Sequence, residues 1–204
     1  MRHQIVLGCL LMTFLLSHPG GAQESKREPV YVGARVCASC HEGPEMGHQY
    51  SRWLLSKHSL AYAALALPEA AEMARLSGIP IEPQKSPVCL GCHATGSEAE
   101  DWEKDPAFSM EDGVQCEMCH GPGSEYMDEE VMRDPAEAAR LGLRKPTADL
   151  CAKCHYVKGS HVAVHQLPQL DIQEALKTIA HPTPDGARPG SLLTVTGRET
   201  GADG

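Results

Sequence analysis

Aromatic side chains are scarce in this sequence, which limits the core that the chain can build from its own residues. Phenylalanine, tryptophan and tyrosine make up 4% of the 204 residues. Of the two phenylalanines, Phe14 lies in an N-terminal leader and only Phe108 lies beyond it. Chains that bury too little side-chain surface commonly depend on covalent or metal cross-links. We therefore expect a protein that is unfolded or molten until such a group is attached.

The apolar run near the start of the chain, residues 5–16, is too short to span a bilayer comfortably. Arg2 and His3 precede it and the small residues Gly20-Gly21-Ala22 follow it, which is the order of a secretory signal peptide. We predict that residues 1–22 are a cleaved signal peptide and that the protein is periplasmic or extracellular. An uncleaved anchor is the alternative.

Positive charge is in deficit. Lysine and arginine number 18 against 27 acids, for a net charge of −9, and the leader holds one arginine and no acid. An acidic surface argues against nucleic acid and anionic lipid as partners. It favours docking to a basic or complementary redox protein by electrostatic steering, although the charge would also serve solubility alone.

Cysteine, in contrast, is abundant and strictly patterned. Apart from Cys9 in the leader, the cysteines form four copies of C-x-x-C-H, at residues 37–41, 89–93, 116–120 and 151–155. This pattern is typical of c-type haem attachment, in which two thiols bond the haem covalently and the adjacent histidine is the proximal iron ligand. We predict four covalently bound haem c groups. The attachment residues are Cys37, Cys40, Cys89, Cys92, Cys116, Cys119, Cys151 and Cys154, and the proximal ligands are His41, His93, His120 and His155.

Two other interpretations of the paired cysteines are a tetrahedral zinc site and a redox-active dithiol. Neither explains why histidine directly follows all four pairs. A dithiol enzyme, moreover, needs one such motif and not four.

Histidines outside the motifs are candidates for the distal ligand of each iron. No proline or glycine interrupts residues 49–66, and His58 falls on the apolar face of the helix predicted there. A histidine in such a stripe is more often a core residue, but four irons that each need a sixth ligand favour a ligand role. His161 and His165 share one face of a helix or strand. The remaining histidine candidates are His48 and His181.

The rest of the pattern predicts a mainly helical, loop-rich domain over residues 23–181. Beyond the helix at 49–66, which Pro68 ends, we expect helices at 69–77 and 128–141, the latter interrupted near Pro135. Residues 182–204 are expected to be disordered. The turn Gly121-Pro122-Gly123 either lets a second haem pack against the backbone or is an ordinary turn.

The order of these features resembles the cytochrome c-554 family of tetrahaem cytochromes, first known from ammonia-oxidising bacteria. The matching segments cover most of residues 31–166: Val36–His41, Trp53 with Ser56–Ala61, Cys89–His93, Gly113–Gly123 and Cys151–His155. The resemblance implies a multihaem cytochrome c fold that is mainly α, with short helices wrapped around four stacked covalent haems.

The resemblance also implies a ligand set. In the family three irons are held by two histidines each, and the haem of the second motif has an open face. When this set is carried over by position, His58 would be paired with His155. The third haem would be served by His161 or His165, and His93 would hold the open iron.

The sequence departs from the family pattern at the first haem. In the family, the distal histidine of that haem lies soon after the third motif. Residues 121–154 contain no histidine. Met127, Met132, His48 or a histidine of another chain would replace that ligand, and a thioether would raise the haem's potential.

Iron with two axial protein ligands can change only its electron count, so the favoured function is a periplasmic carrier between redox partners. We name no catalytic residue. One alternative is a haem enzyme that uses an open iron at His93 on nitric oxide, nitrite or hydroxylamine. Another is a subunit of a haem-bridged filament or larger respiratory complex. We expect a monomer or weak oligomer, unless a filament forms, and membrane contact only through partners.

Overall fold

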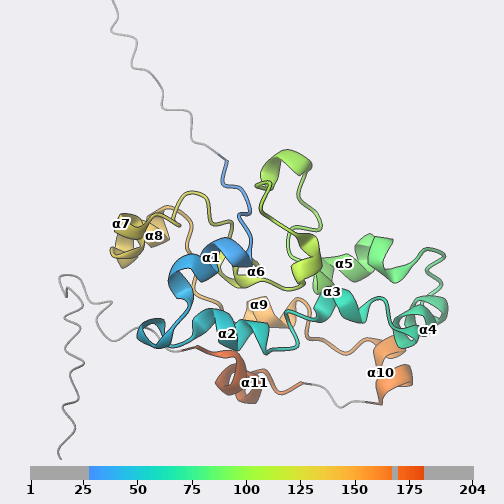
Figure 1. Ribbon diagram of the computed structural model, residues 1–204. Coiled ribbons are helices and arrows are strands. Elements are labelled where there is room, and N and C mark those ends of the chain that lie inside the picture. Colours follow the sequence, from blue (N-terminus) through green and yellow to red (C-terminus); the bar gives the residue numbers. More distant parts are fainter. Residues whose placement is uncertain (1–27, 167–169, 182–204) are drawn as a thin grey trace, which may run out of the picture.

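The computed structural model describes residues 28–166 and 170–181, so the predicted signal peptide and the predicted disordered tail lie outside the described residues. It is built of short helices joined by long loops (Figure 1). The α-helices are α1 Ala34–His41, α2 Gln49–Leu54, α3 Ala61–Ala64, α4 Pro68–Leu76, α5 Pro87–His93, α6 Cys116–His120, α7 Glu129–Met132, α8 Pro135–Arg140, α9 Ala148–Ala152, α10 Gly159–His165 and α11 Ile172–Ile179. The short 3-10 helices are η1 Pro44–Met46, η2 Pro83–Lys85, η3 Asp101–Glu103 and η4 Met110–Asp112. The predicted mainly α, loop-rich fold class is confirmed.

Helices from distant parts of the chain lie against each other. Helix α10 contacts α4, α11 contacts α9, and α1 contacts both α2 and α6 (Figure 1). An isolated bridge between Tyr31 and Lys104 is the one β-type pairing in the described part of the chain. None of the helices in residues 28–166 and 170–181 has the length and apolarity needed to cross a bilayer.

The continuous helix predicted over residues 49–66 is wrong in its middle, where His58 lies. The structure has α2 and α3 with an irregular turn between them. The Ser59 hydroxyl donates to the Ser56 carbonyl oxygen at 2.9 Å, and the Ser56 hydroxyl accepts the His58 N–H at 3.2 Å. Serine side chains compete in this way with helical backbone hydrogen bonds. The turn presents the His58 carbonyl to Val114, whose N–H donates to it at 2.9 Å.

The other predicted helices are present. Helix α4 occupies the expected stretch after Leu67, and the stretch near Pro135 divides into α7 and α8 as predicted. Each of these two helices is capped by an aspartate, since Asp128 and Asp134 accept backbone N–H groups of their first turns.

The segment 113–117, which leads into the third motif, holds the turn around His58 in place. Gly113 has φ +75°, and a Cβ built on it would lie 2.6 Å from the His58 carbonyl oxygen, so a larger residue does not fit. The next residue, Val114, accepts the Trp53 indole N–H at 2.8 Å through its carbonyl oxygen. The residues just before the third motif therefore contact His58, a predicted distal ligand, directly.

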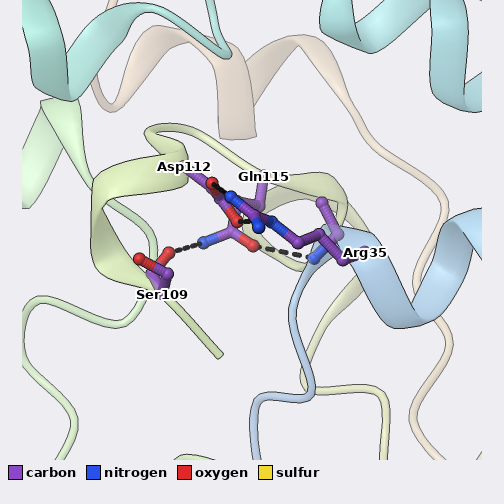
Figure 2. Close-up of polar contacts among 5 residues, drawn as sticks. Arg35, Ser109, Asp112 and Gln115 are labelled. Carbon is purple, nitrogen blue, oxygen red and sulfur yellow. Dashed lines mark hydrogen bonds and ion pairs between the residues drawn. The ribbon is translucent and has the colours of Figure 1, made fainter. Parts of the chain in front are cut away.

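The Gln115 side chain binds two separate stretches of backbone while almost fully buried, with 1% of its surface exposed. Its side-chain oxygen accepts the Ala34 N–H and its amide nitrogen donates to the Ser109 carbonyl, both at 2.8 Å (Figure 2). An ion pair between Arg35 and Asp112, with a closest distance of 3.0 Å, lies beside this amide (Figure 2). The start of α1 is thus attached to the residues around η4.

Glu117 is also buried, and its carboxylate accepts three backbone N–H groups. These come from Val32 and Gly33 at 2.8 Å each and from Gly123 at 2.7 Å. Burial raises the pKa of Glu117, and the three hydrogen bonds oppose that rise. One side chain inside the third motif therefore joins the strand-like stretch before α1 to the loop after α6.

Candidate functional site

The four C-x-x-C-H motifs occupy short helices or their ends. Helices α1 and α5 end at the motif histidine, and α6 consists of the third motif alone. Cys151 lies in α9, and His155 follows that helix. Residues three apart on a helix face the same side, so a helical motif presents both thiols in one direction. This local geometry suits two bonds to one flat group.

The imidazoles of three motif histidines are oriented by hydrogen bonds at their Nδ1 atoms. The partner is the Ala61 carbonyl for His93 and the Arg144 carbonyl for His120, both at 2.9 Å. For His41 it is the Gln49 side-chain oxygen at 2.5 Å. Because these oxygens only accept, each Nδ1 carries the proton and each Nε2 keeps its lone pair. A histidine that ligates a metal commonly makes such a second hydrogen bond.

Three motif histidines face a second imidazole within the described residues. A first-row metal ion bonds an imidazole nitrogen at about 2.1 Å, so two rings on one ion have centroids roughly 6 Å apart. The observed centroid separations are 5.9 Å for His58 and His155, 6.4 Å for His93 and His161, and 5.9 Å for His120 and His181. Each pair fits a single iron between its rings.

The pairings agree with the family-based expectation at one motif and differ at two. His58 lies opposite His155, as the resemblance implies. His161, expected with His165 to serve the third haem, instead faces the second motif, because α10 packs against α4. His181 faces the third motif, because α11, which precedes it, packs against α9. The sequence offered only a histidine among prolines as a signal for this position.

The remaining candidates lie at the surface. His48 is an exposed residue that precedes α2 with φ +53°, and Met127 is 51% exposed. His165 is exposed at the end of α10. The sixth ligand of the iron at the first motif stays a prediction.

Burial favours the neutral form of several of these imidazoles. It lowers the pKa of His58, with a smaller contribution from His155, and it also lowers the pKa values of His120 and His155. The pKa of His161 is lowered first by burial and then by the nearby Lys158. A neutral imidazole has a free lone pair, which is the form that binds a metal.

A cavity of ≈ 870 Å³ lies between two of the imidazole pairs. This volume is within the range of about 300–1,000 Å³ that is common for ligand and cofactor sites. The wall residues Tyr156, Val157, Val162 and Leu170 are 42% to 56% exposed. Exposed apolar walls fit a large apolar plate. The cavity is also lined by His58, His93, His155, His161, Cys92, Cys119, Cys151 and Cys154.

The motif thiols lie next to one another in a fixed order. A hydrogen bond with Cys116, together with burial, raises the pKa of Cys37. Burial and then the neighbouring Cys151 raise the pKa of Cys119. Burial and a hydrogen bond with Cys92 raise the pKa of Cys154 to about 11. The first motif is therefore next to the third, the third next to the fourth, and the fourth next to the second.

Comparison with known proteins gives one family match and one relative. A family model described as cytochrome c554 and c-prime matches residues 36–121. Cytochrome c-554 of Nitrosomonas europaea is 27% identical over 155 residues, which span 74% of this chain and 63% of that protein. No solved structure matches the chain at a significant level. Both matches confirm the predicted resemblance to the cytochrome c-554 family.

Proposed function

We propose that this chain is an exported, periplasmic tetrahaem cytochrome that carries electrons between redox partners. The observation that carries the proposal is the placement of a second imidazole opposite three of the motif histidines. A bound haem would supply one-electron redox chemistry, and the paired histidines would occupy both ligand positions of its iron, so that no position would remain for a substrate. The chain's part is to hold each iron through a proximal histidine and each macrocycle through two thiols.

The order of the motifs supports transfer from one haem to the next. Neighbouring attachment thiols, such as Cys37 with Cys116 and Cys92 with Cys154, bring successive groups close together. The order runs from the first motif through the third and fourth to the second. Cys40 of the first motif is exposed, whereas the other motif cysteines are half-buried. This supports exchange with a partner at the first motif.

The acidic charge supports a basic or complementary redox protein as the partner. With a net charge of −9, the chain would attract a positively charged surface over several ångströms. Such docking is fast and weak, as a carrier requires, and it weakens as salt rises.

Intact mass and redox titration of the purified protein test the proposal. The intact mass of the denatured chain should correspond to four covalent haems and no leader. The redox titration should show four reversible one-electron steps. A chain without covalent haem would contradict the cytochrome assignment. Turnover of nitric oxide, nitrite or hydroxylamine at rates typical of enzymes would favour the catalytic alternative, and sedimentation as a polymer would favour the filament.

The partner is tested by rates of electron exchange. We expect faster exchange with a basic redox protein than with an acidic one of similar potential, and a loss of that preference at high ionic strength. Equal rates at low salt would contradict steering by charge.

A further inference from the structure

The second motif is held so that its imidazole points into the cavity. His93 ends α5, and its Nδ1–H donates to the Ala61 carbonyl at 2.9 Å. The opposite atom of the ring, Nε2, is thereby left with its lone pair. His93 and the adjacent Gly91 and Cys92 line the ≈ 870 Å³ cavity.

A second imidazole reaches the same space from a distant part of the chain. The rings of His93 and His161 have centroids 6.4 Å apart, with 37° between their planes. This separation is close to the roughly 6 Å expected for two imidazoles on one metal ion. Both residues line the cavity.

Two contacts outside the ring pair hold α10 at this place. Lys158, the residue that precedes the helix, lies with its Nζ 3.6 Å from the Cys92 Sγ. The helix itself packs against α4. The position of His161 at the second motif therefore follows from the packing of α10, and not from the contact between the two rings alone.

His165 is the competing candidate, because it is one helical turn further along α10 and also lines the cavity. It is exposed, however, whereas His161 is half-buried, and the ring that approaches His93 is that of His161. The geometry thus distinguishes the two.

We propose that His161 is the sixth ligand of the iron held by His93, so that the second haem of this chain is closed to exogenous ligands. The family resemblance implies the opposite, an open iron at His93. The inference rests on the proposed function, since it requires a haem at the second motif. Its consequence is that the second haem transfers electrons and does not bind nitric oxide or nitrite.

The test uses the haem-loaded protein and its His161→Ala and His165→Ala variants. Peptide mass spectrometry first establishes that Cys89 and Cys92 carry haem, and an unmodified peptide would refute the proposed function itself. Electron paramagnetic resonance then measures spin state, and titration with carbon monoxide after reduction counts open irons.

We expect His161→Ala to gain one high-spin haem and one carbon monoxide site per chain relative to the unmodified protein. Added imidazole should reverse both changes, and His165→Ala should show neither. Equal counts in His161→Ala and the unmodified protein, or a gain in His165→Ala alone, would overturn the assignment.

A second variant covers the case in which His161→Ala does not fold. His161→Met keeps two ligands on the iron but exchanges imidazole for thioether, which raises a haem potential. We expect one of the reduction potentials to rise while every haem that was low-spin stays so. An unchanged set of potentials would count against His161 as a ligand.

Discussion

The chain up to Ala138 and the chain after it are held together in different ways. Every buried residue in the described ranges lies between Val32 and Ala138, and each described residue from Ala139 onward is half-buried or exposed. In the first part, buried side chains such as Gln115 and Glu117 bind backbone groups directly. In the second part, His155, His161 and His181 face rings of the first part.

This difference teaches how a chain with few aromatic residues is stabilised. The first part forms hydrogen bonds among its own residues, which do not need the cofactor. The second part, with α9, α10 and α11, has little buried surface of its own, and it meets the first part at predicted iron ligands and where α10 packs on α4. We infer that attached haem contributes most of the stability of the second part.

The largest expected effect comes from removing the fourth attachment by Cys151→Ser together with Cys154→Ser. Residues 148–157, none of which is buried, should lose hydrogen-exchange protection by about 100-fold or more. Residues 113–117 should keep their protection. The measurement is hydrogen exchange by mass spectrometry on the protein with its other haems attached.

The matched control is the double variant Cys37→Ser, Cys40→Ser at the first motif. Helix α1 is attached to Gln115 through its own backbone, so it should stay protected. Equal loss at both motifs would remove the contrast between the two parts.

Next in size is Gly113→Ala. The added Cβ would lie 2.6 Å from the His58 carbonyl oxygen, in a left-handed backbone conformation, so the free energy of unfolding should fall by roughly 3–5 kcal/mol. Denaturant unfolding of the haem-loaded protein measures it.

Gly78→Ala is the control for Gly113→Ala, since Gly78 has a similar φ of +67° but nothing within 4 Å of an added Cβ. Its cost should be about 1–2 kcal/mol, from the backbone alone. If the two variants were equally stable, the close approach to His58 would not matter.

Glu117→Ala follows, with an expected loss of about 3 kcal/mol or more in the free energy of unfolding. Three buried N–H groups would lose their acceptor, and each unpaired group costs about 1–3 kcal/mol. Glu129→Ala, which removes an exposed ion pair with Arg133, should cost at most about 1 kcal/mol. Comparable losses in these two variants would contradict the role given to Glu117.

The smallest effect is expected for Asp112→Asn. The Arg35 side chain is 70% exposed, so its ion pair with Asp112 should contribute about 1 kcal/mol or less, and less still in 1 M salt. Unfolding at low and high salt gives the difference. A loss as large as that of Glu117→Ala would show that this ion pair, and not the buried amide of Gln115, attaches the start of α1 to the residues around η4.

The sequence predicted the helical class and several helices, but not the break at residues 55–60. Periodicity placed His58 on an apolar helix face, whereas serine hydroxyls and a bond from the distant Val114 end the helix there. A local stretch of sequence around His58 does not include Val114, so periodicity cannot predict that hydrogen bond.

The glycines after the third motif give a second example. One of the two interpretations of the turn Gly121-Pro122-Gly123 is that a haem packs against it. In the structure, a Cβ on Gly121 would lie 2.9 Å from the Gly142 carbonyl oxygen, and one on Gly123 would lie 2.9 Å from Val32 Cγ2. The nearest atoms at both positions belong to the chain, so close packing of polypeptide is enough to require glycine.

What the sequence by itself predicted is the chemistry of attachment, because two thiols and a histidine lie within five residues and fit on one short helix. Which histidine faces which motif was decided only by the tertiary structure. His161 and His181 reach the second and third motifs because α10 packs on α4 and α11 on α9. Such packing depends on contacts between residues far apart in the chain, and no local spacing encodes it.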